Sequence, residues 1–292
     1  MIIAFGLGVG ILIGLTGIGG GAIMTPLLVL FAGVPPVVAI GTDLAYGAVT
    51  KTAGGWRHLR KGRVDLGVSK WLAVGSVPGA LAGVWLLDRL HAAYGTSFEP
   101  ALLICVAVAL LIVALTILGR ALFMPRLAER ERDAIEQTRR TKLSAVGIGA
   151  FLGLLLGVTS VGSGALVGLA LILVFKLTPH RVVGTDVFHA AILLWAAGLA
   201  HLASGNVDFL LMATILAGSL PGVLVGAQLV EYVPAGVLRF VLGCVLLAAA
   251  LGVLSKAGLD VSPIALLGLP VAVGVLAWLL ARSRRPAEVA AT

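Results

Sequence analysis

The chain has 292 residues, of which 60% are hydrophobic and only 12% are charged. Soluble domains average about 45–50% apolar and about 25% charged residues, so this composition excludes an ordinary soluble domain and indicates a helical membrane protein. The formal net charge of +8 does not indicate nucleic-acid binding, because the basic residues gather in the turns and tail that flank apolar segments.

Apolar runs follow one another along the whole chain, and we expect each to form a helix. They cover residues 2–15, 22–33, 36–57, 65–89, 99–119, 143–157, 165–176, 180–203, 208–230, 235–255 and 262–282. The runs 2–15, 22–33, 143–157 and 165–176 are too short to cross a hydrocarbon core of about 30 Å at about 1.5 Å per residue. These four form two pairs, each interrupted by a glycine-rich motif. Each pair is therefore either one interrupted crossing or a re-entrant hairpin.

An internal repeat organises these runs. Residues 14–83 recur at residues 157–226, shifted by 143 positions (157 − 14) without a gap. The motif GLTGIGGGA returns as GVTSVGSGA, AIGTD as VVGTD, and GSVPGALAG as GSLPGVLVG. Internal repeats that contain interrupted membrane helices are typical of secondary transporters.

The basic residues change sides between the two copies. The turn HLRKGRVD of the first copy carries lysine and arginine, whereas the matching HLASGNVD carries neither. Conversely, the turn KLTPHR of the second copy holds Lys176 and Arg181, where the matching turn around VPPV is uncharged. Because lysine and arginine accumulate on the cytoplasmic side, this reversal predicts two copies inserted upside down relative to each other. The hairpin interpretation places most basic residues inside, so we favour it.

The predicted fold is an all-α polytopic membrane protein with two inverted-topology repeats. Each repeat contains a broken or re-entrant half-helix pair and three transmembrane helices, and one extra helix follows at the C-terminus. The first membrane repeat covers residues 1–119 and the second covers residues 143–255. A cytoplasmic basic linker, residues 120–142, joins them, and it is either a lipid-binding or regulatory segment or a solvated connector. Residues 256–292 form the C-terminal helix and a basic tail.

The glycine-rich motifs are candidate substrate sites. Glycine accepts backbone angles that interrupt a helix, and the half-helix after the break begins with unpaired N–H groups at the positive end of its dipole. Such an end favours an anion. Close packing of helices at small residues is the alternative interpretation. The predicted substrate-binding residues are Thr16, Gly17, Gly19, Gly20 and Gly21 in the first copy and Thr159, Ser160, Gly162, Ser163 and Gly164 in the second.

Four ionisable residues could contribute to transport. Asp43 and Asp186 occupy equivalent GTD motifs in the first turns of two helices. A buried carboxylate there can carry a proton or help to hold Na⁺, whereas a carboxylate facing water would only stabilise the helix N-terminus. His189 could relay protons or be a hydrogen-bonded structural histidine. Lys51, whose counterpart is Leu194, could attract an anionic substrate or extend to the cytoplasmic interface.

Motifs of other protein classes are absent or out of context in the sequence. It contains no Cys/His cluster, no P-loop motif and neither HExxH nor GxSxG. GIGGGA fits the letters of a dinucleotide-binding motif, but its flanks are apolar helices and not a βαβ unit. We therefore expect no metal, no cofactor and no enzymatic activity. The expected partners are a small anionic substrate, the lipid bilayer and a coupling H⁺ or Na⁺; the oligomeric state stays open.

Three sequence blocks resemble the sulfite exporter TauE/SafE family. They are the opening G-x-G-G-G-x-x-x-x-P-L, the block GTDLAYGAVTKTAGGWRHLRKGRVD and the block GSVPGALAG, and their second-copy counterparts match the second half of that family. The resemblance covers about residues 1–255. It implies a multi-pass permease that exports sulfite, sulfoacetate or related organosulfonates across the bacterial cytoplasmic (inner) membrane.

From the repeat and the resemblance together we expect a secondary transporter that works by alternating access. An anion channel of the same architecture is the alternative. Coupling to a proton or Na⁺ through Asp43 or Asp186 is one expectation, and a uniporter driven by the membrane potential is another.

Overall fold

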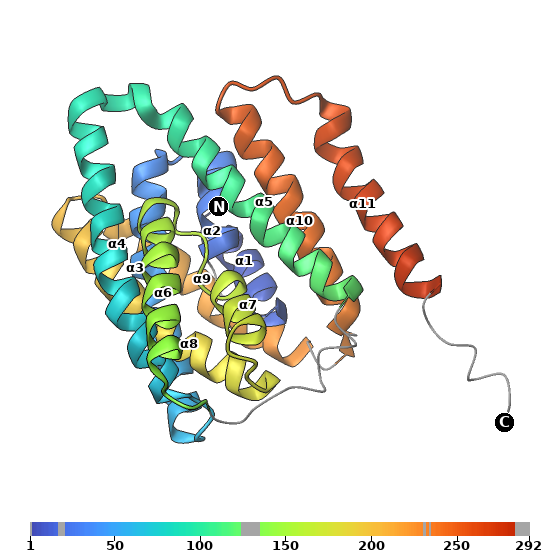
Figure 1. Cartoon of the computed structure of the whole chain (residues 1–292). Coiled ribbons are helices and arrows are strands. Elements are labelled where there is room, and N and C mark those ends of the chain that lie inside the picture. The colour runs from blue at the N-terminus through green and yellow to red at the C-terminus, as the bar shows by residue number, and fades with distance from the viewer. Residues whose placement is uncertain (1, 17–20, 124–134, 230–231, 234, 284–292) are drawn as a thin grey trace, which may run out of the picture.

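The computed structural model describes residues 2–16, 21–123, 135–229, 232–233 and 235–283 (Figure 1). The described residues form α-helices, one short 3₁₀ helix and connecting turns. The all-helical class predicted from the apolar runs is therefore confirmed. α11 lies at the edge of the bundle beside α10.

The helices follow the predicted order. In the first copy they are α1 (Ile2–Thr16), α2 (Gly21–Phe31), α3 (Pro36–Arg60), α4 (Leu66–Tyr94), η1 (Gly95–Phe98) and α5 (Glu99–Phe123). In the second copy they are α6 (Arg139–Thr159), α7 (Ala165–Leu173), α8 (Pro179–Ala203), α9 (Phe209–Leu229) and α10 (Ala235–Lys256), and α11 (Pro263–Ser283) follows. Under the shift of 143 positions, α1, α2, α3 and α4 correspond to α6, α7, α8 and α9.

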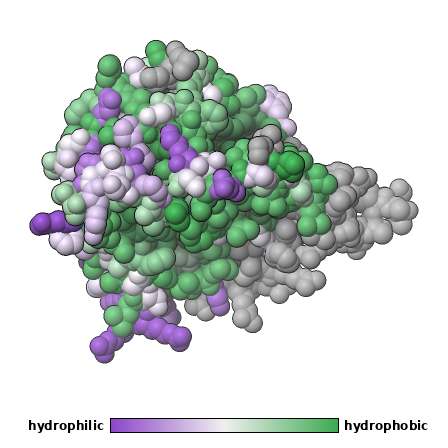
Figure 2. Space-filling view, turned by 90° about the horizontal axis from the view of Figure 1, so that it is seen from above, coloured by the Kyte–Doolittle hydropathy of each residue, from purple (hydrophilic) through white to green (hydrophobic). Residues whose placement is uncertain are grey.

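Membrane insertion is supported by length, apolar character and surface. Within the described residues, four stretches are long and apolar enough to cross a membrane: Leu66–Gly119, Arg139–Thr159, Pro179–Ala203 and Phe209–Gly226. Large apolar side chains such as Leu115, Phe151 and Leu224 lie exposed on the outside of the bundle. Apolar residues also cover much of the face in Figure 2, where hydrophilic residues are confined to patches. These features describe a multi-pass membrane protein.

One predicted boundary is wrong. The run 143–157 was expected to be too short to cross a membrane, but α6 has 21 residues. The difference arises in the first turn, where the polar residues Arg139 to Lys142 are helical although they contribute nothing to an apolar pattern. The side chain of Thr138 caps this turn, because its hydroxyl accepts a hydrogen bond from the N–H of Thr141 at 3.2 Å.

The two copies are interleaved and do not form separate bundles. α4 packs along α6, and the equivalent pair α9 and α1 packs in the same way. Glycines bring the backbones together: a Cβ atom at Gly153 would lie 2.7 Å from Cα of Ser76, and one at the equivalent Gly10 would lie 2.7 Å from Cα of Ser219. No real Cβ fits there, so small residues are required for this close approach of membrane helices.

α3 and α8 pack against each other at the centre of the bundle. Ala45, near the start of α3, contacts Gly198, near the end of α8. Gly55, near the end of α3, contacts Phe188, in the first half of α8. Since the contacts advance along one helix as they retreat along the other, the two helices run antiparallel.

The threonines of the two GTD motifs tie each copy to the other. The hydroxyl of Thr185 accepts a hydrogen bond from the N–H of Asp65 at 2.8 Å, and the hydroxyl of Thr42 accepts one from the N–H of Asp208 at 3.0 Å. Asp65 and Asp208 in turn accept hydrogen bonds from backbone N–H groups in the first turns of α4 and α9. This reciprocal pairing fixes the starts of α3 and α8, which carry the neighbouring aspartates.

Candidate functional site

Asp43 lies at the centre of a buried polar cluster. Only 1% of its surface is exposed, and one carboxylate oxygen, Oδ2, accepts hydrogen bonds from Thr25 Oγ1 at 2.6 Å and from Ser160 Oγ at 2.7 Å. Thr25 lies in α2, whereas Ser160 belongs to the break between α6 and α7. The aspartate of one copy thus contacts the helix break of the other. Among the described residues its second oxygen, Oδ1, has no hydrogen-bond partner.

Asp186, the equivalent residue of α8, binds the break of its own copy. Its Oδ1 accepts a hydrogen bond from the backbone N–H of Gly164 at 3.1 Å, and Gly164 is the N-cap of α7. The predicted break is present here, since Ser160, Gly162 and Gly164 have φ angles of 60°, 131° and 100°. A carboxylate is therefore held at the positive end of α7, where the N–H groups and the helix dipole favour negative charge.

The start of α2 lies against the helix break of the second copy. Gly21, the first residue of α2, is so close to Ser160 that a Cβ atom on it would lie 2.6 Å from the Ser160 carbonyl oxygen. The same position is 3.8 Å from Oδ2 of Asp43. Gly21 of the first copy and Ser160 of the second, far apart in sequence, are therefore neighbours beside the carboxylate of Asp43.

Lys51 is buried in the middle of α3. Its side chain is 8% exposed, so it does not extend to the interface, which was one of the two interpretations of this residue. It interacts electrostatically with both Asp43 and Asp186. None of the described residues accepts a hydrogen bond from its ammonium group. A buried cation within a membrane-spanning helix is costly and marks a functional site by default.

Lys51 also lies where α3 and α8 cross. The next residue, Thr52, accepts a hydrogen bond at 2.8 Å from the indole N–H of Trp195, which is its own equivalent in the second copy. Residue pairs related by the repeat meet only near the symmetry axis between the copies. Because the counterpart of Lys51 is Leu194, only one of these two equivalent positions carries a charge.

His189 belongs to the same cluster through α4. It is buried, and its Nε2 lies 3.2 Å from Oγ of Ser76. The equivalent residues of the other copy, Tyr46 and Ser219, also lie beside each other. Both serines come from the GSxPG motif, and sequence analysis missed them as site residues although the repeat pairs them.

The remaining predicted residues belong to the two glycine-rich motifs. Thr159 and Ser163 are buried at the second break, and Thr159 donates a hydrogen bond to the carbonyl of Leu155 at 2.7 Å. Thr16 ends α1, next to the first break. Gly17, Gly19 and Gly20 lie outside the described residues. Thr25, which was not predicted, corresponds to Gly168, so the repeat carried no signal for it.

Interrupted helices and buried charges inside an apolar helical bundle are the features of a membrane transporter. The chain matches the family model described as "Sulfite exporter TauE/SafE" over residues 2–253. This protein belongs to the TauE/SafE family, as its sequence blocks indicated.

Curated relatives agree with this class. The chain is 37% identical over 250 residues to "Probable membrane transporter protein YjnA" of Bacillus subtilis, covering 86% of this chain and 97% of the relative. It is 30% identical over 233 residues to "Probable membrane transporter protein YdhB" of the same organism, covering 79% of this chain and 89% of the relative. No solved structure matches the chain.

Proposed function

We propose that this protein is a secondary transporter, not an enzyme, and that it exports small sulfur-containing anions such as sulfite, sulfoacetate or related organosulfonates across the bacterial cytoplasmic membrane. One observation carries this proposal: the ammonium group of Lys51 is buried beside Asp43 and Asp186, and both aspartates contact the helix break between α6 and α7. A substrate anion would supply the hydrogen-bond acceptor that this ammonium group lacks among the described residues.

The chemistry of the substrate suits the cluster. A sulfite or sulfonate group presents three acceptor oxygens around one sulfur atom. An ammonium group offers three rotatable donors, and charge-assisted hydrogen bonds to it are stronger than neutral ones. The hydroxyls of Thr25 and Ser160 donate to Asp43, and they would be further donors to a substrate when that carboxylate is neutralised.

We propose further that the two copies lie inverted in the membrane. The antiparallel packing of α3 and α8 supports this arrangement, because inverted copies related by an axis in the membrane plane must meet with antiparallel helices. The reversed placement of lysine and arginine in equivalent turns supports it independently. In this arrangement α6 and α7 form a re-entrant hairpin, since Arg140 near the start of α6 and Lys176 after the end of α7 line one common pocket.

Equivalent positions in the two copies should then be labelled from opposite sides. In a background where Cys105 and Cys244 are replaced by alanine, we expect Lys61→Cys to react with a membrane-impermeant maleimide only after the cytoplasmic side is opened. Ser204→Cys, the equivalent position, should react from outside in intact cells. Both turns are exposed, so access decides the result. Labelling of both from the same side would refute the inverted arrangement.

Alternating access would use the symmetry of the bundle. The pairs α1–α9 and α4–α6 are equivalent, and each pair is packed by glycines as a unit. We propose that these pairs move relative to the α3–α8 crossing and expose the cluster to each side in turn. Asp43 or Asp186 would couple the movement to a proton or Na⁺.

Counterflow tests the proposal directly. Purified protein in proteoliposomes loaded with unlabelled sulfite should accumulate labelled sulfite transiently above its equilibrium level, and the initial rate should saturate. A channel gives no such overshoot. Uptake that rises linearly with concentration and lacks counterflow would favour the channel and reject a transporter.

A further inference from the structure

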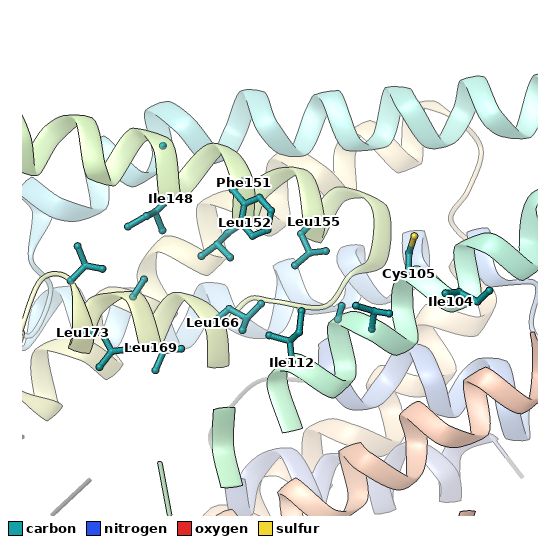
Figure 3. A pocket seen from close by; sticks show the side chains of 15 residues that line it. Ile104, Cys105, Ile112, Ile148, Phe151, Leu152, Leu155, Leu166, Leu169 and Leu173 are labelled. Atoms are coloured by element: carbon teal, nitrogen blue, oxygen red, sulfur yellow. The ribbon is translucent and has the colours of Figure 1, made fainter. Parts of the chain in front are cut away.

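An apolar groove is lined by the side chains shown in Figure 3. It has a volume of about 780 Å³ and lies between α5, α6 and α7. Ile104 and Ile112 of α5, Phe151 and Leu155 of α6, and Leu166 and Leu173 of α7 line it. Phe151 is 65% exposed, so the groove opens to the surroundings of the protein. This volume is in the range of pockets that hold a ligand with many apolar atoms.

One end of the groove is basic. A second cavity of about 410 Å³ shares the lining residue Val174 with the groove, so the two cavities adjoin. Arg140, Ser144 and Lys176 line it, together with Thr141, whose hydroxyl is shared with Thr138. Its lining brings two cations together and, among the described residues, includes no acidic side chain.

The backbone at Lys176 has an unusual conformation for a residue other than glycine. Lys176 has a φ angle of 54°, a left-handed conformation that favours glycine. The equivalent position at the end of α2 is Gly33, with a φ angle of 66°. The same turn therefore ends both half-helices, and the second copy places a lysine there despite the cost of a Cβ atom. The first copy has no cation at this turn, whereas Lys176 of the second copy lies beside the apolar groove.

We propose that these two cavities together bind an anionic glycerophospholipid. Arg140 and Lys176 hold the phosphate, with the hydroxyl of Ser144 as a further donor, and an acyl chain fills the groove. Basic pockets between membrane helices are the sites where proteins bind anionic lipid headgroups. A sulfite or short sulfonate does not explain the groove, because it has no long apolar part.

Bound lipid would act on the broken hairpin. Leu155 and Leu166 flank the break from Thr159 to Gly164, and both line the groove. An acyl chain packed against them stabilises the relative position of α6 and α7, and with it Ser160, which contacts Asp43. The protein should therefore be more stable with the anionic lipid bound. This inference does not depend on which substrate is transported.

Native mass spectrometry of delipidated full-length protein tests the site. Phosphatidylglycerol should bind more tightly than phosphatidylcholine with the same acyl chains. The double variant Arg140→Gln/Lys176→Gln should bind phosphatidylglycerol about 30-fold more weakly, the loss expected for two basic residues that face an anionic lipid. The matched control Arg139→Gln/Lys142→Gln removes the same amount of charge from the first turn of α6, outside the cavity lining, and should bind as the wild type does.

A third variant tests the groove itself. Gly147 lines it, and a Cβ atom there meets no neighbour within 4 Å. Gly147→Phe should fill the groove and lower the binding of phosphatidylglycerol while the thermal stability of lipid-free protein is unchanged. Equal affinity for the two lipids, or equal losses in the double variant and its control, would overturn the proposal. A dimer that Gly147→Phe dissociates without any effect of lipid would overturn it in favour of a second copy as the occupant.

Discussion

Replacing Lys51 by leucine should lower sulfite counterflow at least about 30-fold, because removing one partner of a buried charge pair typically costs about 2–5 kcal/mol. The protein should still fold. Leucine occupies the equivalent position 194 of α8, where it is buried at the same crossing of the two central helices. The change thus makes the two copies alike at the point where they now differ.

Electrostatics give the reason for this loss. With Lys51 present, one cation faces two carboxylates. With leucine, the cluster of Asp43 and Asp186 loses this positive charge, and an incoming anion meets a more negative site. Lys51→Arg retains the charge and should keep measurable transport. Lys70→Leu is the matched control, since it removes an exposed lysine and should not change transport.

Folding must be measured beside transport. Size-exclusion profiles and thermal stability in detergent should be similar for Lys51→Leu, Lys70→Leu and the wild type. Wild-type counterflow by a folded Lys51→Leu protein would exclude this residue from the substrate site and remove the main support for the proposed function.

Much of the central cluster could be predicted from the repeat alone. Asp43 and Asp186 stand in identical motifs, and burial of both follows from their position within apolar helices that pack in a symmetric pair. Ser76 and Ser219 were available by the same argument, because the repeat aligns them within GSxPG. Residues of a repeated motif occupy equivalent positions in the two copies, and equivalent positions lie close together where the two copies are in contact.

Other contacts could not be predicted from the sequence. Ser160 bonds Asp43 of the other copy, whereas its equivalent, Gly17, has no hydroxyl. Which copy's carboxylate meets which break depends on how the two copies interleave, and hydropathy carries no information about that. The interleaving instead depends on glycines such as Gly10 and Gly153, whose small size acts only once a particular partner helix is adjacent.

The helix boundaries show a second limit. Apolar periodicity located the helices, but it placed the start of α6 at residue 143, whereas the helix begins at Arg139 and includes the polar residues up to Lys142. Hydropathy marks the apolar part of a helix, and the helix itself can continue into polar residues. Hydropathy also could not predict whether Lys51 is buried, because the hydropathy of the segment is the same whether the lysine faces protein or lipid.

Replacing both aspartates by asparagine should abolish the pH or Na⁺ dependence of transport. With both carboxylates ionised, the cluster of Asp43, Asp186 and Lys51 has a net charge of −1 and opposes an anion. With both protonated, its charge is +1. Wild-type transport of a sulfonate, whose own charge does not change near neutral pH, should therefore increase as the pH falls. The double variant Asp43→Asn/Asp186→Asn mimics the protonated form, so its transport should be flat with pH.

Asparagine is the appropriate substitution because it retains the contacts that hold the cluster together. Its amide oxygen can still accept from Thr25 and Ser160 at position 43 and from the N–H of Gly164 at position 186, so the helix breaks should keep their geometry. Asp260→Asn, at an exposed position, is the control and should leave the profile unchanged.

His189 and Tyr46 are the other titratable groups of the cluster, so either could carry the coupling proton in place of the aspartates. A pH profile that persists unchanged in the double asparagine variant would assign the coupling proton elsewhere, with His189 as the next residue to replace. Loss of the profile in Asp43→Asn alone would show that the two copies act unequally. We expect this asymmetry, because Asp43 contacts Thr25 of its own copy and Ser160 in the helix break of the other, and because its helix carries Lys51 where α8 has Leu194. The symmetric scaffold would then supply the alternating movement, and the asymmetric residues would supply the anion chemistry.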